Sequence, residues 1–128
     1  MKFSELLKQM PDFIGANGCA EETVSACETA LGVRFASDYR EYLKEIGLAC
    51  FDGRELTGIS KTPRLSVVEV TKEERALNEA IPADFYVIEE IGYDGMVIWQ
   101  SSNGAVYKSS PNKKPQKICK SLAEYIGM

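Results

Sequence analysis

The chain has 128 residues, a formal net charge of −4 and no histidine. This length fits one domain over residues 1–128, and a composition of 45% hydrophobic and 27% charged residues excludes a disordered chain. The absence of histidine excludes Ser-His-Asp triads, Cys-His dyads and histidine metal sites.

The acidic charge lies in the first 110 residues. Residues 1–60 carry 6 basic and 10 acidic side chains, residues 61–110 carry 5 and 8, and residues 111–128 carry 4 and 1. An acidic body repels nucleic-acid phosphate and attracts basic proteins. The sequence shows neither an apolar run of the roughly 18 residues that span a bilayer nor a signal-peptide centre. We therefore expect a cytoplasmic protein that binds neither nucleic acid nor membrane.

The four cysteines are scattered, without a C-x-x-C pair, at Cys19, Cys27, Cys50 and Cys119. In a reducing compartment we expect buried thiols, and the even number leaves two disulfides open as the alternative. A four-cysteine zinc site needs closely spaced pairs. We therefore predict no metal and no cofactor.

Three amphipathic helices are predicted in the first 47 residues. The first covers residues 3–10, and the second covers residues 21–31, with Gly32 as its C-terminal cap. The third runs from a Ser37 cap to Gly47. Its apolar stripe consists of Tyr39, Tyr42, Leu43 and Ile46, and its other face carries Arg40, Glu41, Lys44 and Glu45. Residues 15–18, between the first two helices, are predicted to be a loop.

Residues 48–65 are predicted to form loops with one or two short strands around Leu56–Ile59. A helix follows from about Ser66 to Ala80, with Thr71 as an alternative start. Both Ser66-x-x-Glu69 and Thr71-x-x-Glu74 have the spacing of a capping box, which leaves the start open.

Strands dominate the chain after Pro82. Residues 85–91, 96–100 and 105–108 are predicted strands, joined by turns that contain glycine. A loop rich in proline and lysine then leads to a short helix capped by Ser121. The order of elements predicts an α+β fold: an antiparallel meander packed against the N-terminal helices and the mid-chain helix, with a short C-terminal helix. We expect the helices to cover one face of the sheet and Trp99 to lie in the core.

Three pairs of carboxylates are the candidates for chemistry: Asp52 with Glu55, Glu73 with Glu74, and Glu89 with Glu90. Adjacent residues of a strand point to opposite faces, so Glu89 and Glu90 do not share a site, and we expect one to be buried or paired. Asp52 and Glu55 lack a third ligand for a metal. We therefore predict a protein that is not an enzyme, and a metal held by Asp52, Glu55 and a further carboxylate would revive the enzymatic reading.

The junction of the second and third helices resembles the SUKH superfamily (the Smi/Knr-like domain). Leu31, Gly32, Phe35, Tyr39 and Leu43 match its pattern, and the resemblance covers roughly residues 21–125. Two departures are Ala36, where proline is usual, and Gln100, where aspartate often follows the strand. The resemblance implies an antiparallel sheet packed against helices and no catalytic residues. It also implies an immunity role, because many bacterial members neutralise a toxin domain, commonly a nuclease or deaminase.

We therefore predict an immunity protein that occludes the active site of a cognate, basic toxin domain, as a monomer or weak dimer. The candidate partner-binding residues are Asp52, Glu55, Tyr93, Asp94, Glu41 and Glu45. The alternative is a regulatory or scaffold module that binds another protein or a small ligand. The basic segment Lys113–Lys120 is interpreted as a solvated loop that protects a sheet edge, with anion binding as its alternative.

Overall fold

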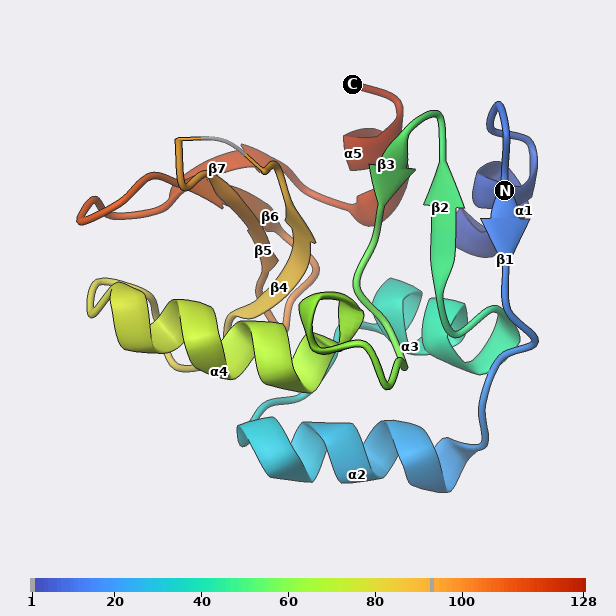
Figure 1. Cartoon of the computed structure of the whole chain (residues 1–128), viewed down its shortest axis with the longest axis horizontal. Coiled ribbons are helices and arrows are strands. Elements are labelled where there is room, and N and C mark those ends of the chain that lie inside the picture. The colour runs from blue at the N-terminus through green and yellow to red at the C-terminus, as the bar shows by residue number, and fades with distance from the viewer. Residues whose placement is uncertain (1, 93) are drawn as a thin grey trace.

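Five helices and two antiparallel sheets make up the fold in the computed structural model, which describes residues 2–92 and 94–128 (Figure 1). The helical segments are α1 (Phe3–Lys8), α2 (Glu21–Leu31), α3 (Ser37–Glu45), the 3-10 turn η1 (Pro63–Leu65), α4 (Val67–Leu77) and α5 (Leu122–Ile126). The strands are β1 (Ile14–Gly15), β2 (Ala49–Phe51), β3 (Arg54–Glu55), β4 (Tyr86–Glu90), β5 (Val97–Gln100), β6 (Val106–Ser109) and β7 (Gln116–Cys119). The small sheet has the order β1-β2-β3 and the large sheet the order β4-β5-β6-β7, so the predicted α+β class is confirmed.

Local signals place the first two helices, although α1 ends at Lys8 and not at Met10, but they do not place the cap of the third. Gly32 ends α2 in the left-handed conformation, with a φ of 67°, as predicted. The predicted Ser37 cap is wrong: Ser37 is the first helical residue, and Ala36 occupies the cap position without a side-chain bond. The Ala36 N–H instead donates to the buried hydroxyl of Tyr86 at 2.8 Å. A contact across 50 residues therefore sets the start of α3.

The charged face of α3 is tied to α2. Arg40 pairs with Glu28 at 2.7 Å and also with Glu21, and Lys44 pairs with Glu21 at 3.2 Å. Residues 40 and 44 carry like charges one helical turn apart, which would weaken an isolated helix. The acidic residues of α2 lie against both of them and offset this repulsion.

Helix α4 begins as predicted but ends three residues early. The Ser66 hydroxyl accepts the Glu69 N–H at 3.3 Å, so Ser66 and not Thr71 is the cap. Thr71 is buried, and its hydroxyl accepts the N–H of Val87 at 3.0 Å. The helix stops at Leu77 because the Asn78 side chain accepts the Ala80 N–H at 3.0 Å, which closes a turn in place of another helical turn.

The short strands are the main error of the sequence prediction. Pairing in the small sheet involves Ala49–Phe51 and Arg54–Glu55, not Leu56–Ile59, because the turn Asp52-Gly53 has positive φ at both residues and joins its strands directly. β1 overlaps the predicted loop at residues 15–18 in one residue, Gly15. β7 lies in the predicted lysine-rich loop and forms an edge of the large sheet. The basic segment Lys113–Lys120 therefore contains an edge strand itself and is not only a loop beside a sheet edge.

Both faces of the large sheet are buried, whereas the sequence predicted one. Ile88, Ile98 and Val106 belong to the main core, which also contains residues of α1, α2, α3 and α5. Val87, Val97 and Trp99 pack with Val70 of α4 in a second cluster. Trp99 is 1% exposed, which confirms its place in the core. Strands covered on both sides carry nearly continuous apolar residues, as β4 and β5 do.

All four cysteines are free thiols, and each is partly buried. The alternative of two disulfides is therefore wrong. Across residues 2–92 and 94–128, no helix combines the length and the apolar character needed to cross a membrane.

Candidate partner-binding site

A buried ion pair joins the two sheets. Arg54 of β3 donates to both carboxylate oxygens of Glu89 on β4, from Nη2 at 3.0 Å and from Nε at 3.3 Å. The Tyr125 hydroxyl of α5 donates to Oε1 of Glu89 at 2.6 Å. The Glu89 side chain is 6% exposed, against 28% for Arg54. The carboxylate is thus held by three donors, and the guanidinium also contacts the rings of Phe51 and Tyr125.

Burial and the adjacent charges change the acidity of the donors. Burial and the neighbouring Glu89 carboxylate raise the pKa of Tyr125, so its hydroxyl keeps its proton and remains a donor. Burial lowers the pKa of Arg54, but the hydrogen bond and charge of Glu89 outweigh it, and the net shift is upward. Glu89 is buried and paired, whereas Glu90 is exposed. The expectation that one of these two residues is buried or paired is therefore confirmed.

The ion pair lines a cavity of about 520 Å³ between the hairpin β2–β3, the end of β4 and α5. We call this cavity the acidic groove. Its lining residues are Gly53, Arg54, Glu55, Glu89, Glu90, Ile91, Gly92, Tyr125 and Met128. Three carboxylates thus face one guanidinium, and the groove carries an excess of negative charge.

Three of the predicted partner-binding residues lie at or beside the acidic groove. Glu55 lines it and pairs with Arg64 of η1 at 2.6 Å. Asp52 is exposed in the β2–β3 turn, next to the lining residue Gly53. Asp94 is exposed in the β4–β5 turn, two residues beyond the lining residue Gly92. Tyr93 lies outside the described residues.

The other two predicted residues do not line the groove. Glu41 and Glu45 are exposed on α3. Glu45 accepts hydrogen bonds from the hydroxyl of Ser4 and from Lys2, the latter at 3.2 Å, and these donors hold its pKa below the usual range. Glu45 therefore fastens α1 to α3.

A second carboxyl pair lies at the edge of the groove. Glu90, which lines the groove, shares a hydrogen bond with Glu74 of α4. Burial, followed by this bond and the negative charge of Glu90, raises the pKa of Glu74 to about 8. The stronger partner of Glu74 is therefore Glu90 of β4 and not its sequence neighbour Glu73.

Sequence reasoning missed Arg54 and Tyr125. The Asp-Gly turn would have placed Arg54 at the start of a strand, but nothing local indicates that it meets Glu89, 35 residues away. Tyr125 lies in the predicted C-terminal helix, where nothing local indicates that its hydroxyl meets Glu89, 36 residues away. Within residues 2–92 and 94–128, no group of three or more histidine, cysteine, aspartate or glutamate side chains is placed to hold a metal ion.

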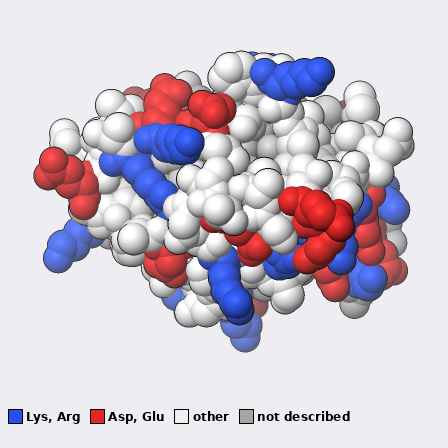
Figure 2. All heavy atoms as spheres, turned by 90° about the horizontal axis from the view of Figure 1, so that it is seen from below, with Lys and Arg blue, Asp and Glu red and all other residues white. Residues whose placement is uncertain are grey.

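The helical underside of the molecule contrasts with the acidic groove. Figure 2 shows this face, on the side of α2 and α4, with acidic and basic side chains interleaved and no continuous area of one sign. Cross-helix pairs such as Arg40–Glu28 account for part of this mixture. A strongly charged partner therefore finds less net attraction there than at the groove.

Comparisons with known proteins agree with this fold. The family model described as SMI1-KNR4 cell-wall (SUKH_6) matches residues 21–126. A crystal structure of a protein from Pseudomonas syringae pv. tomato is similar to this chain with a TM-score of 0.75 and 14% sequence identity, covering 98% of this chain and 93% of that one. At this identity the likeness concerns the fold alone. No curated protein matches the chain.

Proposed function

The chain belongs to the SMI1-KNR4 (SUKH_6) family, and on this premise we propose that it is an immunity protein that binds and neutralises a cognate toxin domain. The family match over residues 21–126 is the observation that carries the proposal, since many bacterial SUKH domains have this role. We propose that the toxin is a nuclease or deaminase and that the protein acts in the cytoplasm by covering the toxin's active site.

The charge of the acidic groove supports this proposal. A domain that acts on RNA or DNA tends to carry a basic substrate cleft, and a negative surface on its inhibitor complements that cleft. Glu55 and Glu90 line the groove, and Asp52 and Asp94 stand in the adjoining turns. Attraction between opposite charges also accelerates association, which suits the rapid capture of a toxin.

The size of the molecule is consistent with such an interface. A standard protein interface takes about 800 Å² from each partner. The protein exposes 6931 Å², so one such patch would use roughly a ninth of its surface. A patch of this size can include the groove and both adjoining turns.

We propose that binding alone, without catalysis, carries the function. The buried carboxylate in the groove, Glu89, is already bonded to Arg54 and Tyr125. A carboxylate engaged in this way serves as a structural partner, whereas acid–base work needs a carboxyl group within reach of a substrate proton.

The description of the matching family as a cell-wall family favours a second candidate, a regulatory or scaffold module that binds another protein. The two candidates differ in their genetic setting. An immunity gene lies directly beside a gene for a large multidomain toxin, whereas a general regulatory module has no such neighbour.

Co-expression with the toxin domain encoded beside the gene tests the immunity proposal. We expect the cells to survive and the two proteins to co-purify in equal amounts. A double variant, Asp52→Lys with Glu55→Lys, is the control and should protect less well at equal expression. Death of the cells despite full expression of the wild-type protein, with no complex recovered, would contradict the proposal.

A further inference from the structure

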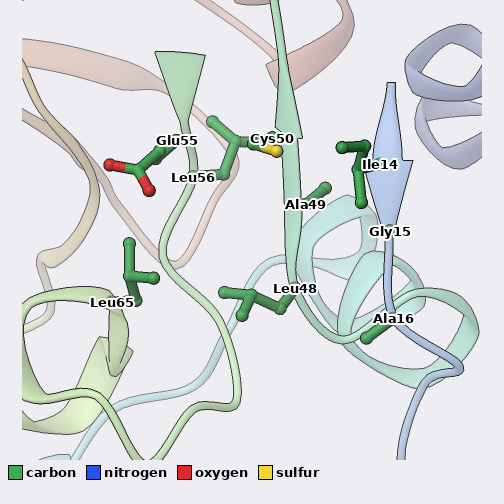
Figure 3. Close-up of a pocket in the computed structure, with 9 residues that line it drawn as sticks. All are labelled: Ile14, Gly15, Ala16, Leu48, Ala49, Cys50, Glu55, Leu56 and Leu65. Carbon is green, nitrogen blue, oxygen red and sulfur yellow. The ribbon is translucent and has the colours of Figure 1, made fainter. Parts of the chain in front are cut away.

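An apolar hollow lies next to the acidic groove, on the other side of Glu55. Its volume is about 280 Å³. Figure 3 shows the residues that line it: Ile14, Gly15, Ala16, Leu48, Ala49, Cys50, Glu55, Leu56 and Leu65. Glu55 is the one charged residue among these and also lines the acidic groove. The two depressions therefore adjoin at a single carboxylate.

The outer face of the small sheet forms one wall of the hollow. Ile14 and Cys50 are cross-strand partners, as are Cys50 and Glu55, so these three side chains share a face. The residues on either side of Cys50, Ala49 and Phe51, belong to the buried core. The small sheet is thus covered on one face, while its other face presents an apolar row that ends in a carboxylate.

The edge of this apolar surface is formed by a large hydrophobic side chain, Ile14, that is mostly exposed to solvent. Ile14 is 69% exposed, and among the described residues only Leu77 and Met128 are other large hydrophobic side chains with comparable exposure. Met128 lines the acidic groove, so two of these three flank the adjoining depressions. A contiguous apolar surface rimmed by polar residues marks an interaction site, and Ile14 is continuous with the apolar lining of the hollow.

The volume of the hollow indicates what it can hold. Pockets for drug-sized ligands measure about 300–1,000 Å³, so this hollow lies below that range and suits a single large side chain. Protein interfaces are commonly anchored by one such aromatic or aliphatic side chain in a pocket near their centre. A protein segment is therefore a better occupant than a small molecule.

The charge at the edge of the hollow indicates what lies next to that side chain. Glu55 pairs with Arg64, but their side chains are 48% and 62% exposed. Solvent screens an ion pair this exposed, so a lysine or arginine of a partner can compete with Arg64 for Glu55. Glu90 and the Glu89–Arg54 pair continue the surface into the acidic groove.

We infer that the apolar hollow is the socket for an anchoring aromatic or aliphatic side chain of the partner, and that a lysine or arginine next to this anchor binds Glu55. The inference rests on the proposed immunity function and specifies where the toxin docks and which side chains it presents. Glu55 receives the cation, Leu48, Leu56 and Leu65 surround the anchor, and Ile14 covers one side of it.

Two substitutions test the socket without emptying the core. Ala16→Phe fills the hollow from an exposed position, and Ile14→Ser removes the apolar edge. We expect each to weaken the affinity for the catalytically inactivated toxin domain at least about tenfold, measured by titration calorimetry. Their thermal unfolding midpoints should stay near that of the wild type, because both side chains are exposed. Leu77→Ser, at a residue that is 67% exposed on α4, is the matched control and should change the affinity less than about twofold.

The outcomes separate this inference from the proposed function. If the wild type binds the toxin and both socket variants bind equally well, the socket is wrong and the immunity function stands. If the wild type neither binds nor protects, the immunity function is wrong and the socket falls with it. A dimer of the protein alone in sedimentation velocity, abolished by Ala16→Phe, would assign the hollow to a second copy of the chain and overturn the inference.

Discussion

Two buried polar clusters each include a residue of β4, and they differ in what surrounds them. In the first, Gln100 accepts from the Tyr86 hydroxyl at 2.6 Å and donates to Asp38 at 2.9 Å and to the Gly104 carbonyl at 3.1 Å. The other oxygen of Asp38 accepts the Leu122 N–H at 3.1 Å. This cluster joins β4, β5, α3 and α5, and both Gln100 and Tyr86 are fully buried.

The second cluster, Arg54, Glu89 and Tyr125, is equally well bonded but opens onto the acidic groove. The comparison shows that a buried polar network does not in itself mark a functional site. The closed cluster holds elements together, whereas the open one also borders a space that a partner can enter. The nearby cavity, and not the burial of polar groups, distinguishes the two.

The largest effect is expected from opening the closed cluster. Gln100→Leu keeps the size of the side chain but leaves Asp38, Tyr86 and Gly104 each without one bond. We expect a loss of about 3 kcal/mol in the free energy of unfolding, measured with urea. Gln116→Leu, at an exposed glutamine of β7, is the matched control and should change it by less than about 0.5 kcal/mol. A similar small change for both variants would contradict the structural role of the closed cluster.

The open cluster should be less costly to break. Glu89→Leu leaves the guanidinium of Arg54 and the hydroxyl of Tyr125 without their acceptor. We expect a loss of about 2 kcal/mol, below the range of about 3–5 kcal/mol for fully buried pairs, because Arg54 is partly exposed. The double variant Arg54→Met with Glu89→Leu should recover part of this loss. If the losses of the single variants Arg54→Met and Glu89→Leu simply add in the double variant, the ion pair contributes nothing to the free energy of unfolding.

Charge reversal at the acidic groove should change the kinetics of binding more than stability. Asp52→Lys, Glu55→Lys and Asp94→Lys should each slow association with the toxin domain up to about tenfold at low ionic strength, with a smaller effect at high salt. Stopped-flow fluorescence measures the rate. Glu41→Lys on α3 is the control and should slow association less. Unchanged rates for all three groove variants would remove this surface from the interface.

The smallest effect is expected at the carboxyl pair Glu74–Glu90. Because the folded-state pKa of Glu74 is raised to about 8, its stabilising contribution is present below the unfolded-state value and is lost as the pH rises through about 8. Glu74→Gln should therefore stabilise the protein at pH values above about 8, by no more than about 1 kcal/mol, since solvent screens a carboxyl group this exposed. Thermal unfolding at acidic and alkaline pH checks the sign of the Glu74→Gln effect. An equal effect at both pH values would contradict the coupling of Glu74 with Glu90.

Short-range signals predicted the helices well. Glu21–Leu31 has its bounds as predicted, because Gly32 supplies the left-handed cap that only a residue without Cβ adopts at low cost. Ser66 and Ser121 cap α4 and α5 as their spacing to Glu69 and Glu124 indicates. These interactions join residues three positions apart, so they are readable from the chain alone.

Short strands escaped prediction because two to four residues carry too little periodicity. β1 and β7 exist only because β2 and β6 lie beside them, and such pairing depends on residues far apart in the chain. The start of α3 was mispredicted for the same reason, since the N–H of the cap residue Ala36 bonds to the hydroxyl of Tyr86, 50 residues away.

The candidate site likewise combines features that local sequence predicts with features that depend on contacts between distant residues. The acidic residues Asp52, Glu55 and Asp94, and the opposite orientation of Glu89 and Glu90, follow from composition and from the alternation of a strand, both of which are local properties. The pairing of Glu89 with Arg54, 35 residues away, and the hollow between β1, β2 and η1 arise from packing. A cavity is lined by several segments that are distant in the chain, so it cannot be predicted from any one of them.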